Sequence, residues 1–157
     1  SKAIYAVGRI VLFSAPGATL APQTVRDLAD PRITKIAIAN PSHAPFGRAA
    51  REAMQHAGVW TAVSRKIVEA ENVQQALRFT LSGNVDVGVV SLSLATASPG
   101  RWALVPSDLH APIDQALVVC SNGRAGTAAG RRFAAFVGST AGRAIMQKYG
   151  LASSRLP

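Results

Sequence analysis

Residues 36–50 read IAIANPSHAPFGRAA, and this stretch decides the fold. Its first part closes a compact apolar run over 33–39, which predicts a buried strand that ends at Asn40-Pro41. Its second part opens a helix that we expect over about 46–57, because small apolar residues recur there on one face. Gly58 follows as the helix stop. One strand therefore runs through a short loop into one helix, which is the unit from which α/β sheets are built.

The same strand and helix unit recurs immediately downstream. A strand is predicted over 64–70, and a helix over 73–82 begins after the N-cap Asn72 and stops at Gly83. The next strand, over 85–90, is almost continuously apolar, as expected when both faces of a sheet are covered. Further strands are predicted over 4–13, 103–106 and 115–120, and further helices over 24–28, 127–137 and 140–149. The alternation predicts the α/β class, with a mixed, mostly parallel sheet flanked by helices and with C-terminal helices after it.

The composition is that of a folded domain with a basic bias. Of 157 residues 48% are hydrophobic, which is enough to bury a core and excludes a disordered tail. Lys and Arg number 17 against 8 Asp and Glu, giving +9, and no acidic residue follows Asp114. The single cysteine, Cys120, excludes an intrachain disulfide. No apolar run reaches the 18 residues of a membrane span, so we expect no membrane insertion. The first residues show no signal-peptide pattern, and we expect either that a leader has been removed or that the chain begins inside a longer protein.

The sequence gives little support for catalysis or for a bound metal. His43, His56 and His110 have no His or Cys partner at ligand spacing. No nucleophile elbow and no glycine-rich phosphate loop is present, and the acidic residues are too few to nominate a catalytic pair. We therefore expect no catalytic residue, no metal and no cofactor, and interpret each histidine as a surface or hydrogen-bonded core residue.

The charge of +9 leaves a module that binds nucleic acid or another polyanion as an alternative. The basic residues are scattered, however, and aromatic residues make up only 6% of the chain, without the interleaving that a base-stacking surface needs. A solvated basic face is the favoured interpretation, and nucleic acid is the less favoured partner.

Two similar strand-to-helix junctions point to a small anion instead. The segments 38–47 and 68–73 each end a strand and open a helix on the same side of a parallel sheet. That side is the carboxyl edge, where ligands of open α/β sheets bind. A helix N-terminus offers free N–H groups and a partial positive charge, and Gly47 would let the backbone come close to a ligand. The pattern alone is weak, because every helix has an N-terminus.

Four blocks of the sequence follow one another within about 5–149: residues 36–50, 71–77, 82–88 and 105–113. Together they resemble the periplasmic molybdate-binding proteins of ABC transporters. The resemblance implies a type II periplasmic-binding-protein fold, in which two α/β lobes close on molybdate or tungstate. It implies that the backbone N–H groups of Phe46 and Val73 bind the oxyanion. It also implies a role for Ser91, which stands where some members have a tyrosine whose hydroxyl binds.

The same resemblance implies the biological setting. The chain would be the non-enzymatic substrate-binding component of an ABC importer, located in the periplasm and working with an ABC permease. Neutral donors suit molybdate, a dianion without a proton to donate, whereas a carboxylate would repel it. Smaller sulfate would be rejected by cavity size, and we expect tungstate to compete.

The main departure from this family is length. The chain opens at what resembles the crossover strand into the second lobe. We expect residues 14–113 to form that lobe, and residues 1–13 and 114–157 to be the crossover strands and helices that pack on the first lobe in the family. Without a first lobe, oxyanion binding would be partial or impaired. The apolar helix faces would be covered by a second copy, in a homodimer or a segment-exchanged oligomer. A remnant that binds no ligand is the third possibility.

Overall fold

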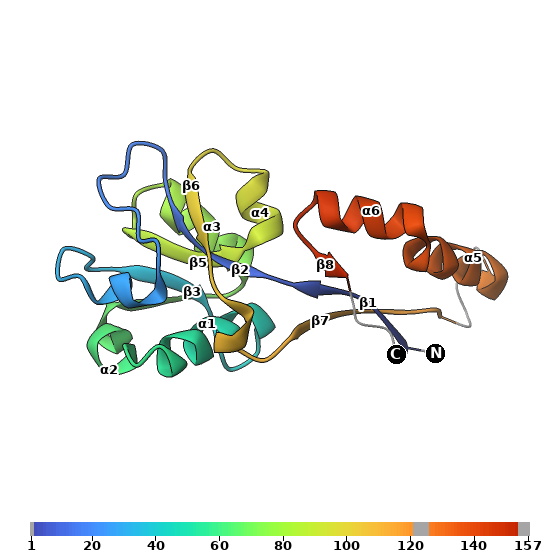
Figure 1. The fold of residues 1–157 in the computed structure, drawn as a ribbon, viewed down its shortest axis with the longest axis horizontal. Coiled ribbons are helices and arrows are strands. Elements are labelled where there is room, and N and C mark those ends of the chain that lie inside the picture. The colour runs from blue at the N-terminus through green and yellow to red at the C-terminus, as the bar shows by residue number, and fades with distance from the viewer. Residues whose placement is uncertain (1, 121–125, 154–157) are drawn as a thin grey trace. The chain divides into compact units, whose positions relative to one another are not determined.

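The computed structural model describes residues 2–120 and 126–153. These residues form two compact units, one of residues 9–113 and one of residues 1–8 with 114–157. Figure 1 shows the elements, which follow one another as β1 (Lys2–Gly8), β2 (Ile10–Ser14), a 3-10 helix (Val25–Ala29), β3 (Ile36–Ala39), α1 (Pro45–His56), α2 (Trp60–Val63), a 3-10 turn (Ser64–Lys66), β4 (Ile67–Ala70), α3 (Val73–Leu81), β5 (Val87–Ser91), α4 (Leu92–Thr96), β6 (Arg101–Leu104), a 3-10 turn (Ser107–Leu109), β7 (Ile113–Val118), α5 (Gly126–Gly138), α6 (Thr140–Lys148) and β8 (Ala152–Ser153).

The larger unit is built on a five-stranded sheet in the order β4-β3-β5-β2-β6. Strand β3 pairs in parallel with both β4 and β5, whereas β2 pairs antiparallel with both β5 and β6. Strands β4, β3, β5 and β6 therefore run in one direction, and β2 runs against them. The predicted mixed, mostly parallel α/β sheet is confirmed.

Helices cover both faces of this sheet. Successive residues of a strand point to opposite sides, and in β3 they enter two different apolar clusters. On one face, Ile36 and Ile38 of β3 belong to the same buried cluster as Ala53 and Met54 of α1. On the other face, Ala37 belongs to a second cluster, together with residues of α3 and α4: Ala76, Leu77, Leu92 and Ala95. Helices α1 and α3 thus lie on opposite sides of the sheet, which matters for the site described below.

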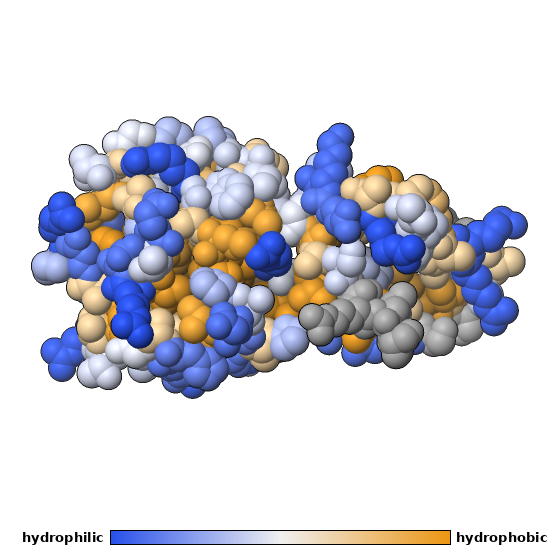
Figure 2. All heavy atoms as spheres, in the orientation of Figure 1, coloured by the Kyte–Doolittle hydropathy of each residue, from blue (hydrophilic) through white to orange (hydrophobic). Residues whose placement is uncertain are grey.

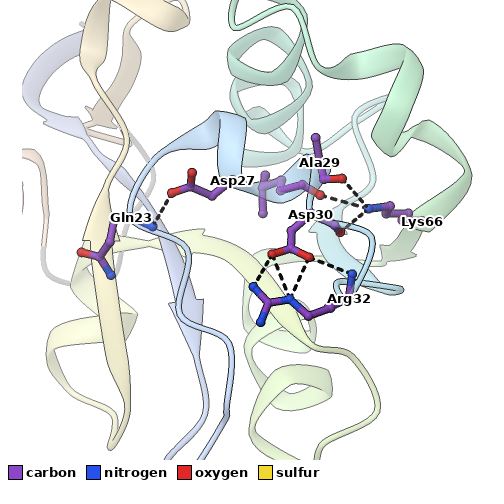
Figure 3. A network of polar contacts seen from close by, with 7 residues as sticks. Gln23, Asp27, Ala29, Asp30, Arg32 and Lys66 are labelled. Atoms are coloured by element: carbon purple, nitrogen blue, oxygen red, sulfur yellow. Dashed lines mark hydrogen bonds and ion pairs between the residues drawn. The ribbon is translucent and has the colours of Figure 1, made fainter.

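A polar network fastens the segment that leads into β3 (Figure 3). The Lys66 ammonium donates to the carbonyl oxygens of Leu28 at 3.2 Å and Asp30 at 2.8 Å, where the first 3-10 helix ends. The Asp30 carboxylate in turn pairs with Arg32 at 2.6 Å, and hydrogen bonds from Arg32 lower the pKa of Asp30 to about 2. These contacts join the 3-10 helix to the start of β4.

The smaller unit contains a three-stranded sheet in the order β7-β1-β8 and the two helices α5 and α6. Ser139 caps α6, because its hydroxyl oxygen accepts a hydrogen bond from the Gly142 N–H at 3.1 Å. Helices α5 and α6 carry apolar side chains at the surface, which Figure 2 shows as orange and tan spheres on the right of the view. The large exposed ones on α5, on α6 and just after it are Phe133, Phe136, Ile145 and Tyr149.

The structure corrects several of the elements expected from the sequence; the strand expected over 33–39, for example, is limited to Ile36–Ala39. The strand predicted over 4–13 is two strands that break at Arg9 and enter different sheets. The strand expected over 64–70 begins only at Ile67, because α2 and a 3-10 turn precede it. The strands expected over 103–106 and 115–120 each lie two residues earlier, at Arg101–Leu104 and Ile113–Val118.

Candidate functional site

Three neighbouring strands of the larger unit end at the same edge of the sheet. Strands β4, β3 and β5 are parallel, and each is followed by a helix: α3, α1 and α4 respectively. The N-termini of these helices therefore meet at the carboxyl edge, the edge at which open α/β sheets bind ligands. The three predicted site residues are brought to this edge: Val73 after β4, Phe46 after the middle strand β3, and Ser91 at the end of β5.

The loop before α1 is held by Asn40. Its side-chain oxygen accepts from the Ser42 N–H at 2.8 Å, and its carbonyl accepts from the Ala44 N–H at 2.9 Å. Pro45 then occupies the first helical turn, where a missing N–H costs nothing. The Phe46 N–H follows, and it has no acceptor among the described residues. One amide of α1 is thus left for an external acceptor.

Gly47 has a role that differs from the one expected. A Cβ atom at this position would lie 1.9 Å from the carbonyl oxygen of Ala39, so only glycine lets the first turn of α1 pack against the end of β3. The close approach is to the chain's own backbone. Gly47 therefore sets where the α1 N-terminus stands relative to the sheet edge, and Phe46 with it.

The start of α3 is capped by side chains in both directions. Asn72, the predicted N-cap, accepts from the Gln75 N–H at 2.9 Å, and the Gln75 side chain accepts from the Glu71 N–H at 2.6 Å. The Asn72 carbonyl accepts from the Ala76 N–H at 3.1 Å and so points into the helix. In a trans peptide the Val73 N–H then points the other way, out of the helix end. Within the described chain no acceptor meets the Val73 N–H.

Two hydrogen bonds join the loops that open α1 and α3. The Asn40 N–H donates to the Ala70 carbonyl at 2.7 Å and continues the β3–β4 ladder by one residue. Further along, the His43 Nε2 lies 3.2 Å from the Glu71 carbonyl oxygen. The helices α1 and α3 cover opposite faces of the sheet, and these two contacts join their opening loops across the sheet edge. Sequence reasoning did not single out His43, although its place in the loop before α1 was visible.

Ser91 reaches the same edge but uses its hydroxyl locally. The Oγ atom accepts from the Leu94 N–H at 3.3 Å as the N-cap of α4, and it lies 3.2 Å from the Ser93 Oγ. The residue is only 4% exposed. Its geometry suits a structural cap.

The electrostatics of this edge favour an anion over a cation. Helix N-termini carry partial positive charge, and the free groups at α1 and α3 are donors. Within residues 2–120 and 126–153, no three His, Cys, Asp or Glu side chains gather as metal ligands. Two surface hollows, of about 570 and 400 Å³, are lined by residues within 20–33 and by residues within 15–20 and 80–86, so neither includes a residue of the α1 or α3 loops.

Comparison with known proteins shows what the chain resembles. A family described as "Bacterial extracellular solute-binding protein" matches residues 1–152. The molybdate-binding protein ModA of Rhodobacter capsulatus is 36% identical over 148 residues, which are 93% of this chain and 57% of that protein. ModA of Azotobacter vinelandii is 34% identical over 140 residues, 82% of this chain and 52% of that protein. This chain therefore spans about half the length of these relatives.

A solved structure extends the likeness to the fold. The periplasmic molybdate-binding protein of Azotobacter vinelandii superimposes with a TM-score of 0.83 at 32% identity, covering 100% of this chain and 68% of that one. These relatives do not support the alternative of a nucleic-acid-binding module. In the part of the chain that the structure describes, no helix has the length and apolar character of a membrane span.

Proposed function

Because the chain belongs to the family of bacterial extracellular solute-binding proteins, we propose that it binds a tetrahedral oxyanion, molybdate or tungstate, at the carboxyl edge of its larger sheet. The observation that carries the proposal is a pair of unused amides, of Phe46 and Val73, at two helix N-termini whose loops are hydrogen-bonded to each other. The named relatives are molybdate-binding proteins, which supplies the chemical class of the ligand.

The amides of Phe46 and Val73 donate to oxygen atoms of one oxyanion. Each comes from the first turn of a helix, where the helix dipole adds a partial positive charge. Neutral donors match an anion that accepts hydrogen bonds and offers none. Because the donor at residue 46 is the backbone N–H, the ligand requires no contact with the Phe46 side chain. The Ser91 hydroxyl acts mainly as the N-cap of α4 and is not assigned as a main donor to the oxyanion.

The site on this chain is partial. The chain covers 57% and 52% of the two ModA relatives, so donors from the remainder of such a protein are outside it. Residues 9–113 act as the second lobe of a two-lobed receptor, whereas β1, β7, α5 and α6 belong to the part that packs on the first lobe. Affinity in the isolated chain is accordingly weak.

The setting is that of an ABC importer. The protein works in the periplasm as a substrate-binding component, delivers its anion to an ABC permease and catalyses no reaction. The exposed apolar residues of α5 and α6 are covered by a second copy, in a homodimer or a segment-exchanged oligomer. Size-exclusion chromatography with light scattering tests this last point: a dimer is expected at micromolar concentration, and a clean monomer contradicts it.

A proline at residue 73 tests the binding site with little disturbance of the fold. Val73 is the first residue of α3, and Asn72 before it is extended, at φ −149° and ψ 171°. Proline is well accepted there, so Val73→Pro deletes one N–H and keeps the helix. Loss of a hydrogen bond to a charged acceptor is expected to weaken molybdate binding by about 10- to 100-fold in titration calorimetry.

Two controls make the result specific. Val73→Ala removes the side chain but retains the N–H, so its affinity should stay within about threefold of the wild type. Thr140→Pro places the same proline at the first residue of α6, after the extended Ser139, and should not change the affinity. Molybdate and tungstate should bind in preference to sulfate. Equal binding of sulfate, or salt-sensitive binding of an oligonucleotide alone, would overturn the proposal.

A further inference from the structure

We infer that His43 is a positioning residue of this site: its imidazole ties the loop that opens α1 to the loop that opens α3, and so sets the spacing of the Phe46 and Val73 amides. The inference rests on the proposed function and adds to it a side chain that does not touch the ligand.

A contact between the two loops is needed because α1 and α3 lie in different layers of the fold. Helices α1 and α3 pack on opposite faces of the sheet, in separate apolar clusters. The core therefore holds each helix to the sheet but does not hold the two N-termini to each other. Two amides bind one small anion together only if their separation is fixed.

The ladder fixes the roots of the two loops but not their ends. The Asn40 N–H to Ala70 carbonyl bond lies at the point where both loops leave the sheet. Beyond it, the first loop runs on through residues 41–44 before α1 begins, while the second needs only residues 71 and 72. The contact between His43 and Glu71 lies further along both loops. His43 is two residues before Pro45, where α1 begins, and Glu71 is two residues before Val73, where α3 begins.

The direction of the hydrogen bond is set by its acceptor. The Glu71 oxygen is a carbonyl and can only accept, so His43 donates from Nε2. A neutral imidazole must then carry its proton on Nε2 and leave Nδ1 without one. This tautomer is an observable consequence that needs no ligand.

Further hydrogen bonds connect the His43–Glu71 contact to the residues around the Val73 amide. Glu71 is engaged on both sides: its N–H donates to the Gln75 side chain at 2.6 Å and its carbonyl accepts from His43. Gln75 is also bonded through its own N–H to Asn72, the cap next to Val73. The imidazole N–H further covers a carbonyl oxygen whose partial negative charge would otherwise stand beside a bound dianion.

Two amide substitutions test the geometry. In His43→Gln the side-chain nitrogen lies about where Nε2 lies, and it can donate to the Glu71 carbonyl; in His43→Asn the amide is one bond too short. We expect molybdate affinity within about threefold of the wild type for H43Q and about five- to tenfold weaker for H43N, as the loss of one hydrogen bond implies. His56→Ala is the matched control, because it removes an imidazole–carbonyl bond, to Leu109 at 2.7 Å, from the far end of the same helix. Equal affinity of H43N and H43Q would overturn the inference.

A measurement without ligand separates this inference from the proposed function. Nitrogen NMR should find the neutral His43 ring protonated on Nε2, and the Phe46 and Val73 amide resonances should move in H43N but stay near their wild-type positions in H43Q. If no oxyanion binds to the wild type, the proposed function fails and these signals still decide the role of His43. Unmoved Phe46 and Val73 amides in H43N, or a proton on Nδ1, would contradict it.

Discussion

The two units of the molecule differ sharply in how much apolar surface they bury by themselves. Both buried clusters of the described chain lie within residues 9–113 and cover the two faces of one sheet. In the smaller unit, the described hydrophobic residues that are fully buried are Ala6 and Val137, while Phe133 on α5 is 65% exposed. The larger unit therefore has a core of its own, whereas the smaller one exposes large apolar side chains on its helices.

Removing an aromatic ring should give the largest difference in unfolding free energy between the two units. Phe13 is 0% exposed in β2, so Phe13→Ala is expected to cost about 3–5 kcal/mol of unfolding free energy. Phe133→Ala should cost less than about 0.5 kcal/mol in dilute solution, because the ring faces solvent. Urea unfolding followed by tryptophan fluorescence measures the larger unit, which contains both tryptophans, Trp60 and Trp102. Hydrogen exchange of the α5 amides measures the smaller unit, to which Phe133 belongs. A Phe133→Ala cost that grows with protein concentration would indicate a second copy on this face.

Adding one methyl group should give the next largest difference. Gly47→Ala places a Cβ 1.9 Å from a carbonyl oxygen and should destabilise the larger unit by about 2–3 kcal/mol. Gly138→Ala, at the end of α5, meets no atom within 4 Å and should be neutral or slightly stabilising. Thermal unfolding of the two variants measures both effects. A neutral Gly47→Ala would mean that α1 does not approach the end of β3 as described.

A partly buried carboxylate in the larger unit, that of Asp86, should make the stability of this unit depend on pH. Burial raises the pKa of Asp86, but hydrogen bonds from Lys35 and Thr34 outweigh it and hold the pKa below its usual value of 3.8. The carboxylate thus stabilises the fold above pH 3.8, and this contribution is lost as the pH falls through the lowered value. Asp86→Asn should cost about 1–2 kcal/mol at pH 7 and progressively less in acid. A cost that stays the same down to pH 2 would contradict this origin.

The two helix caps should give the smallest difference. Asn72→Ala removes the cap of α3 and should lower the unfolding free energy of the larger unit by about 1 kcal/mol. Ser139→Ala removes the cap of α6 and should increase hydrogen exchange only in the smaller unit. Exchange measured on both variants checks whether the units unfold separately. Faster exchange in β3 or β5 of the Ser139 variant would show that they do not.

The larger unit was predictable because its signals are local. The apolar run before Asn40, the Asn72 cap and the stops at Gly58 and Gly83 all lie within one element or at its end, and both glycines have positive φ, +76° and +74°. The break at Arg9 was missed because the apolar pattern runs on through it while the chain passes from one sheet to another. The short helices α2 and α4 were missed because one turn carries too little periodicity.

The candidate site was predictable only in part. Local pattern gave two helix N-termini at one edge, and the family resemblance gave Phe46 and Val73. The His43 contact joins residues 28 positions apart, and no spacing rule connects a loop histidine to a backbone carbonyl at that distance. Gly47 was noticed, but its contact with Ala39 follows from packing that the sequence does not express.

The central claim is that the amides of Phe46 and Val73 bind the same anion. Titration of the ¹⁵N-labelled chain with molybdate, followed by amide NMR, tests it most directly. These two resonances should shift more than others in the larger unit and saturate together with one dissociation constant, while sulfate at the same concentration should leave them nearly unmoved. Two different dissociation constants, or shifts confined to other amides, would contradict it.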